Sequence, residues 1–353
     1  MNQHWETFLQ QQHAMIRDGV VQHFGDPQSE LQAAGADSVV CDLSHLDVIR
    51  FSGEDARTFL NGQFTNDVMH LAENRAQVNG YCSPKGRLLA AFTLWGAGSE
   101  YFMQLPVLLA EPIRKRLAMF ILRSRVKAEI TGDTSVRIGI AGAAAPQIIE
   151  RACSIALDEP FAIARRDNAL VMCLPGSSPR YEIMAAPDAA TGLWQRLTEQ
   201  ATAAGSPCWE WLDIRSGMPA VLPQTQDEFV PQMMNFDVVG GVSFSKGCYP
   251  GQEIVARMHY LGRLKRRMCI AHIASGQAPQ PGEPVFDSND PAQACGMIAR
   301  SAAAPGGGHD VLAVAQIAAI EAAALRWNAP DGPALELLPL PYELPAAVTA
   351  PVH

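Results

Sequence analysis

The sequence predicts an α+β protein whose C-terminal part is a separate β-domain, and two observations support this prediction. Up to about residue 262, segments with the apolar spacing of helices alternate with short apolar strands. Beyond that point, short strand-like segments are separated by Gly- and Pro-rich breaks, a pattern typical of a small β-barrel or sandwich. Because 353 residues exceed what one hydrophobic core usually organises, we expect two or three domains.

The individual elements follow in chain order. Residues 1–35 are polar and are expected to form a helical lead-in. Ser52 can cap a helix that ends near Gly62, since carboxylates follow Ser52 where the helix dipole favours negative charge. Further strands are predicted at 39–46, 48–51, 88–95, 136–141, 169–174 and 181–184, helices at 109–122, 144–156 and 189–203, and a turn at 80–87. The C-terminal strands are predicted at 267–273, 282–287, 294–303, 311–322 and 335–338.

Composition and charge exclude several classes of function. The chain is 48% hydrophobic and 18% charged, which is ordinary for a globular protein. Its net charge of -9 argues against direct binding to nucleic acid or to an anionic membrane surface. No run of about eighteen apolar residues predicts a membrane span. The first residues show no basic segment followed by an apolar run, so we expect no secretory signal and a cytoplasmic protein.

The eight cysteines are scattered and include no C-x-x-C pair. This spacing argues against a disulfide framework and against a zinc or iron–sulfur site, so no metal ligands are predicted. Seven of the cysteines are expected to be buried, reduced thiols. The chain also lacks a P-loop, a G-x-G-x-x-G fingerprint, an H-E-x-x-H helix and a G-x-S-x-G elbow.

Residues 246–253, Lys-Gly-Cys-Tyr-Pro-Gly-Gln-Glu, form the most informative segment of the chain. Its glycines and Pro250 predict a tight loop where the backbone can approach a ligand or another segment closely. Cys248 lies beside Lys246, whose positive charge can favour the thiolate. We therefore predict that Cys248 is a reactive thiol assisted by Lys246, and the alternative is a buried structural cysteine in a turn.

This segment resembles the K-G-C-[YF]-x-G-Q-E signature of the YgfZ family, which is related to the glycine-cleavage T-protein. The match is complete over 246–253. Further resemblance covers nearly the whole chain after residue 40 and includes 51–67, 82–87, 212–219, the Pro231-Gln232 and Asn235 positions, and 338–342.

The resemblance implies a T-protein-like architecture with two α+β lobes and a C-terminal antiparallel β-barrel around a central hole that binds folate. The implied first lobe comprises 36–132 with 212–262, the second 133–211, and the barrel 263–345. The implied cofactor is tetrahydrofolate or a one-carbon derivative. The implied role is support for the assembly or repair of iron–sulfur enzymes, including those that modify tRNA, so the expected partners are folate and iron–sulfur client proteins. The likeness favours a monomer.

The resemblance also implies which residues contact folate. Trp209 corresponds to a family tryptophan and can offer an aromatic face to the pterin, although core packing would also explain it. Leu46 falls where relatives often carry an aromatic residue, and Arg215 falls where they carry a carboxylate. Arginine cannot accept the hydrogen bonds that a pterin donates, so a changed folate affinity or folate form is expected. Lys246 can bind the glutamate tail of folate. Further folate contacts are assigned to Tyr249, Gln252 and Glu253.

Two other functions are weighed against this one. An aminomethyltransferase needs a carboxylate near N5 of folate, and T-proteins carry an aspartate pair in the loop that corresponds to 82–87. Here that loop contains no acid, which argues against the transferase, although Asp67 could substitute. An RNA-binding module is supported only by a basic cluster at Arg257, His259, Arg263, Lys265, Arg266 and Arg267. The sequence leaves open whether the protein is an enzyme.

Overall fold

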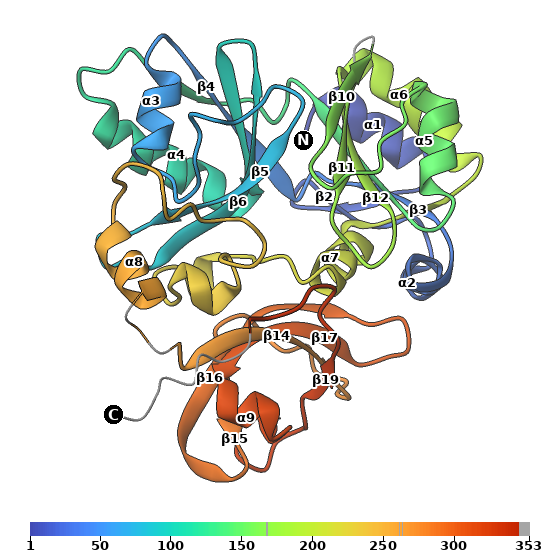
Figure 1. Cartoon of the computed structure of the whole chain (residues 1–353). Coiled ribbons are helices and arrows are strands. Elements are labelled where there is room, and N and C mark those ends of the chain that lie inside the picture. The colour runs from blue at the N-terminus through green and yellow to red at the C-terminus, as the bar shows by residue number, and fades with distance from the viewer. Residues whose placement is uncertain (167–168, 261, 263, 346–353) are drawn as a thin grey trace.

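The computed structural model describes residues 1–166, 169–260, 262 and 264–345. Two α+β lobes lie side by side, and the C-terminal sheet domain lies below both of them in Figure 1. In the part of the chain that the structure describes, no helix is long and apolar enough to cross a membrane. Arg263, one member of the predicted basic cluster, lies outside the described residues.

The first lobe is built on a five-stranded antiparallel sheet with the strand order β5-β6-β7-β4-β8. Its inner face is apolar, and helix α4 packs against β4 and β8. The predicted helix after Ser52 begins at Ala56, after the turn at Gly53. The elements are β4 (Leu46–Ser52), α3 (Ala56–Asn61), β5 (Ala76–Cys82), β6 (Leu88–Ala97), β7 (Glu100–Pro106), α4 (Val107–Ile121) and β8 (Lys127–Ile130).

The second lobe contains a six-stranded sheet with the order β10-β11-β12-β9-β3-β13. Strand β3 (Val39–Asp42) pairs antiparallel with β9, and this differs from the expected domain boundary, which assigned these residues to the first lobe. A valine-rich pattern predicts a strand but does not specify its sheet. The chain therefore crosses from the second sheet to the first between β3 and β4. The remaining elements are β9 (Val136–Ala141), α5 (Ala145–Cys153), β10 (Ile163–Arg166), β11 (Ala169–Leu174), β12 (Arg180–Ala185), α6 (Pro187–Thr198) and β13 (Thr202–Ala204).

The N-terminal lead-in is only partly helical. Helices α1 (Gln3–Gln11) and α2 (Pro27–Ala36) enclose a hairpin of β1 (Met15–Arg17) and β2 (Val20–His23). The turn of this hairpin is the Asp18-Gly19 dipeptide, and both residues have positive φ. An Asp-Gly pair is a known hairpin signal, so the prediction of a helical lead-in over 1–35 was wrong here.

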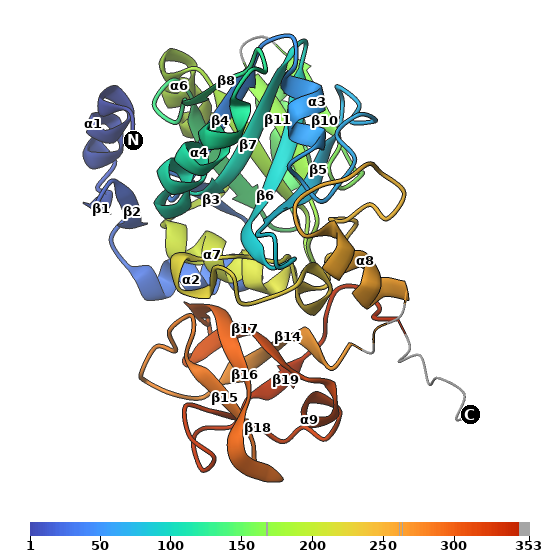
Figure 2. The ribbon, with the colours of Figure 1, turned by 90° about the vertical axis from the view of Figure 1, so that its left-hand side faces the viewer.

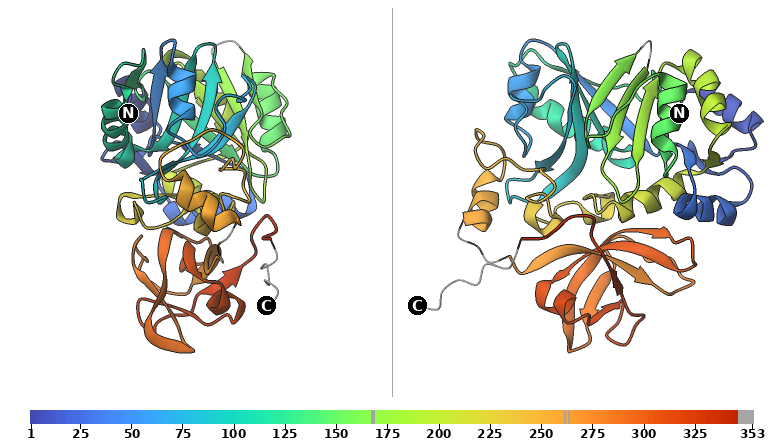
Figure 3. Two further views of the ribbon diagram at one scale, coloured as in Figure 1. Left: turned by 60° about the vertical axis from the view of Figure 1, so that its left-hand side comes forward. Right: turned by 45° about the vertical axis from the view of Figure 1, so that its right-hand side comes forward.

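The C-terminal domain is a six-stranded antiparallel sheet with the order β18-β15-β16-β17-β14-β19. The sheet curls into a half-barrel, which is clearest in the right panel of Figure 3. The strand predicted over 311–322 ends at Gln316, and helix α9 (Ile317–Glu321) follows it. The strands are β14 (Arg266–Ile273), β15 (Pro284–Asp287), β16 (Asp290–Ala303), β17 (His309–Gln316), β18 (Leu325–Trp327) and β19 (Glu336–Leu338).

Two helices connect these parts. Helix α7 (Ser206–Arg215) lies between the lobes and the C-terminal sheet, as Figure 2 shows, and contacts β2, β3, β16 and β17. Helix α8 (Gln252–Tyr260) lies at the edge of the first lobe and contacts the short helix η2 (Pro231–Met234). The loop 246–253 leads into α8, so the two sequence-predicted regions, around Trp209 and around Cys248, occupy different parts of the molecule.

Candidate functional site

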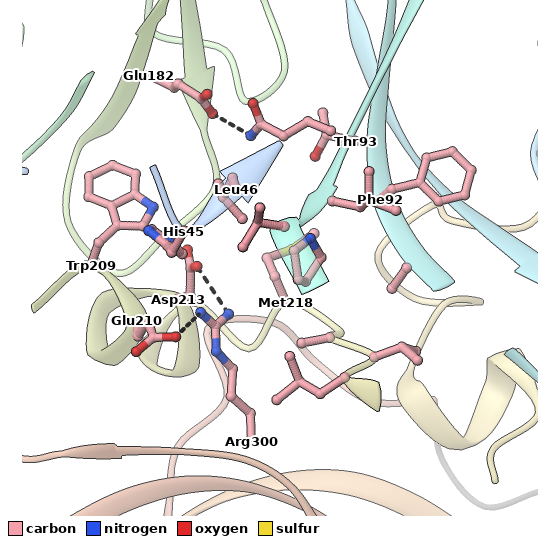
Figure 4. Close-up of a pocket in the computed structure, with 18 of the residues that line it drawn as sticks. His45, Leu46, Phe92, Thr93, Glu182, Trp209, Glu210, Asp213, Met218 and Arg300 are labelled. Carbon is pink, nitrogen blue, oxygen red and sulfur yellow. Dashed lines mark hydrogen bonds and ion pairs between the residues drawn. The ribbon is translucent and has the colours of Figure 1, made fainter. Parts of the chain in front are cut away.

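A cavity of about 450 Å³ lies where the two lobes and the C-terminal domain meet. Figure 4 shows its walls, which come from the crossing between β3 and β4, from β6, β7 and β12, from α7, and from the segment 218–222. Arg300 on β16 lines it from the C-terminal domain. The cavity thus exists only when all three parts of the chain are assembled.

Apolar side chains form the broad walls of the cavity. Trp209 and Leu46, both predicted folate contacts, line it together with Phe92 and Met218. The Trp209 indole is fixed, because the Arg180 guanidinium lies 4.5 Å from its ring centroid. A Cβ atom on residue 139 would come within 2.5 Å of the indole, so only glycine leaves room for it.

Two buried acceptors lie at one end of the cavity. The Gln104 amide on β7 donates to Glu182 Oε2 on β12 at 2.8 Å, which joins the two lobes. The other oxygens of this pair, Gln104 Oε1 and Glu182 Oε1, are buried without a hydrogen-bond partner among the described residues. Burial raises the pKa of Glu182 to about 7. Both residues line the cavity, so a ligand that donates hydrogen bonds could pair with these oxygens once the side chains turn toward it.

An ion cluster closes the opposite part of the cavity. Asp213 on α7 lies between Arg180, to which it is hydrogen-bonded, and Arg300, whose guanidinium is 3.0 Å away. Arg300 also lies 3.7 Å from Glu210. Burial alone would raise the pKa of Asp213, but the two arginines lower it, so this carboxylate is charged and already occupied.

His45 occupies the crossing between β3 and β4 and also lines the cavity. Its side chain is buried, and burial lowers the pKa of its imidazole. Neither the sequence motifs nor the resemblance indicated His45, Gln104, Glu182 or Arg300. Their polar groups come together only in the folded chain.

The loop 246–253 forms a second, separate feature. The Lys246 ammonium donates to the carbonyls of Asn61, Phe64 and Asn66 at 2.5, 2.6 and 3.0 Å. Burial lowers the pKa of Lys246 to about 8, so the ammonium is charged at neutral pH and all three of its N–H groups are used. This differs from the predicted roles of Lys246 as a partner of the thiolate or of a folate tail. Lys246 anchors the loop to the end of α3.

The same loop docks against the predicted turn at 80–87. Gly251 and Gly86 both have positive φ, and a Cβ on Gly251 would come within 2.5 Å of the Gly86 Cα. Tyr249, within the loop, is buried. Of the eight cysteines, all of which lie in the described part of the chain, Cys248 alone is exposed. The loop is therefore held rigidly while its thiol faces solvent.

Several predicted folate contacts do not line the cavity. Tyr249, Gln252 and Glu253 belong to the loop and to the start of α8, and the Gln252 side chain donates to the Lys246 carbonyl at 3.4 Å. Arg215 points to the other side of α7 and pairs with Asp310 at 3.7 Å. Helical periodicity explains this, because residues four apart share a face. Asp213, rather than Arg215, is therefore the charged residue on the same face of α7 as Trp209.

The structure also locates the residues that supported the two alternative functions. Asp67 pairs with His70 at 2.8 Å and does not line the cavity, so it does not replace the acids missing from the 82–87 loop. Within the basic cluster, Arg267 forms an ion pair with Asp237 at 2.8 Å, and His259 stacks on Phe244 at a centroid distance of 3.7 Å. These residues are partly engaged within the fold.

Comparison with known proteins finds relatives for most of the chain. A family model described as the GCVT N-terminal domain matches residues 4–240. The tRNA-modifying protein YgfZ of Colwellia psychrerythraea (strain 34H) is 31% identical over 255 residues, covering 72% of this chain and 75% of that protein. The protein of the same name from Edwardsiella ictaluri is 32% identical over 264 residues, covering 73% and 78%.

A solved structure extends the likeness to the C-terminal domain. The glycine cleavage system aminomethyltransferase T from Bartonella henselae superposes with a TM-score of 0.74 over 90% of each chain, at 13% sequence identity. Such a likeness shows the fold alone. The chain therefore belongs to the YgfZ family of GCVT-domain proteins and has the fold of the glycine-cleavage T-protein.

Proposed function

We propose that this protein binds tetrahydrofolate, or a one-carbon derivative of it, in the central cavity. The GCVT fold is a folate-binding fold. We further propose that the protein supports the assembly or repair of iron–sulfur enzymes in the cytoplasm, including enzymes that modify tRNA, through the exposed thiol of Cys248. Its similarity to proteins named as tRNA-modifying supports this part of the proposal.

The buried acceptor pair is the observation that carries the folate assignment. A pterin presents two hydrogen-bond donors along one edge, the N3–H and the 2-amino group. Glu182 Oε1 and Gln104 Oε1 are two buried acceptors that lack partners among the described residues. Burying these acceptors without hydrogen bonds destabilises the protein, and a ligand that supplies the donors would remove this cost. Trp209 and Leu46 provide apolar walls that suit the flat ring. Bound tetrahydrofolate would supply the nitrogens that carry a one-carbon unit.

The exposure of Cys248 supports a protein partner for the thiol. None of the residues 246–253 lines the cavity, and Cys248 faces solvent from a loop that Lys246 and Gly251 hold in place. A thiol in this position can meet a group on another protein without entering a pocket. We therefore treat folate binding and the thiol as two separable activities. Aminomethyl transfer is disfavoured because the 82–87 loop supplies no carboxylate to the cavity.

The experiment separates the two activities. Tetrahydrofolate is titrated calorimetrically, under anaerobic conditions, into wild type, Glu182→Gln and Cys248→Ala. Loss of charge-assisted hydrogen bonds is expected to weaken binding to Glu182→Gln by about 10- to 100-fold, while Cys248→Ala binds like wild type. In cells that lack the protein, Cys248→Ala is expected not to restore the activity of an iron–sulfur tRNA-modifying enzyme. Wild type that binds no reduced folate would refute the folate assignment, and full restoration by Cys248→Ala would refute the role of the thiol.

A further inference from the structure

His45 is a buried polar residue for which the fold offers no partner. The residue is 9% exposed and lines the cavity. Among the described residues, neither Nδ1 nor Nε2 has a hydrogen-bond partner. The backbone around it is fixed, because the His45 carbonyl accepts from Val107 N at 3.0 Å and Leu46 N donates to the Leu43 carbonyl at 3.0 Å. The crossing between the two sheets therefore fixes the backbone of His45 at the cavity wall.

The charge state of the imidazole follows from its surroundings. Burial favours the neutral form and lowers the pKa of His45. Around it, the carboxylates of Glu210, Asp213 and Asp42 favour the protonated form, while Arg300 opposes it. Asp213 and Glu210 are themselves paired with Arg300, which limits their effect. A neutral imidazole offers one N–H donor and one acceptor nitrogen.

A structural role does not explain this residue. A buried polar group without a hydrogen bond destabilises the folded state, and an apolar side chain of similar shape would pack at least as well. Residues that break this rule are expected at functional sites. His272 provides the contrast, because its Nδ1 contacts Asp310 at 2.9 Å and thereby links β14 to β17.

We propose that His45 contacts the folate ligand directly and positions it through a ring nitrogen. The ligand group that it meets is a polar nitrogen or oxygen beyond the pterin edge that Glu182 and Gln104 bind, because Figure 4 shows His45 separated from Glu182 along the cavity. Leu46, the next residue in the chain, lines the same wall, so the crossing supplies one polar and one apolar contact. This inference rests on the proposed folate site.

The test measures two quantities on each of four proteins. Tetrahydrofolate affinity is measured by calorimetry, and the urea midpoint of the ligand-free protein is measured by fluorescence. His45→Phe is expected to bind about tenfold or more weakly, as loss of a buried hydrogen bond implies, with an unchanged or higher urea midpoint. His45→Gln keeps a donor and an acceptor and is expected to retain most of the affinity. The control, His272→Phe, is expected to lower the midpoint and leave affinity unchanged.

The outcomes distinguish this inference from the proposed function. If wild type binds tetrahydrofolate and His45→Phe binds it equally well, the role of His45 is wrong and the folate site stands. If His45→Phe loses stability but not affinity, His45 is a structural residue. If wild type binds no tetrahydrofolate, both proposals fall. Should phenylalanine prevent folding, His45→Leu removes the same nitrogens with a smaller side chain and decides the question by the same two measurements.

Discussion

Replacing Gly251 by alanine tests how the loop with the exposed thiol is held. Gly251 has a φ of +80°, and a Cβ there would lie 2.5 Å from both the Gly86 Cα and the Ser83 carbonyl oxygen. These contacts are with backbone atoms of the neighbouring turn, so no side-chain rotation relieves them. The substitution must either strain the loop or move it away from the turn.

The size of the effect can be estimated from three contributions. A left-handed conformation costs alanine about 1–2 kcal/mol, and overpacking against backbone adds about 1–3 kcal/mol. The lower entropy of the unfolded alanine chain offsets about 0.4–1 kcal/mol. We therefore expect Gly251→Ala to lower the free energy of unfolding by about 2–4 kcal/mol.

The matched control lies in the same loop. A Cβ on Gly247 meets no atom within 4 Å, and its φ is not in the left-handed region. Urea unfolding followed by tryptophan fluorescence compares the two variants, and Gly247→Ala is expected to stay within about 0.5 kcal/mol of wild type. Equal stability of Gly251→Ala and Gly247→Ala would show that the loop does not dock on the turn at Gly86.

Three further predictions concern Lys246, Glu182 and Cys248. Lys246→Met should lower the free energy of unfolding by about 3 kcal/mol, because three carbonyls lose a charged donor. The control in the same urea assay is Lys85→Met, at an exposed position. An equal effect of both changes would contradict the role of Lys246 in anchoring the loop. The pKa of Glu182 is raised from 4.5 to about 7 by burial, so its protonated form stabilises the fold below pH 4.5, and this stability is lost as the pH rises toward 7. Glu182→Gln should therefore gain about 3 kcal/mol relative to wild type between pH 4.5 and pH 8, and a pH-independent difference in urea midpoints would refute this pKa. A thiol reagent should modify one cysteine rapidly in the native protein and none in Cys248→Ala, whereas replacing the buried Cys295 should change nothing. Six of the other cysteines are buried and Cys153 is partly buried, so several thiols that react as fast as Cys248 would contradict this arrangement.

The proposed folate site was only partly predictable from the sequence. Trp209 and Leu46 were assigned through the family resemblance, and both line the cavity. Arg215 was assigned by its place in the motif, yet the turn of α7 directs it to Asp310 and directs Asp213 to the cavity. Helical periodicity alone could have made this distinction.

The sequence by itself determined the α+β class, the C-terminal sheet domain, the family and the tight loop that carries Cys248. These features depend on local patterns, because apolar periodicity, Gly/Pro breaks and an eight-residue signature are all read within short windows of the chain. The tertiary structure alone decided that β3 joins the second sheet, that Lys246 is bound by three carbonyls, and that Gln104 meets Glu182. Lys246 and Phe64 are 182 residues apart, and Gln104 and Glu182 are 78 residues apart. Such contacts follow from how the sheets and loops pack together, and no local pattern encodes which distant polar atoms that packing brings within hydrogen-bond distance.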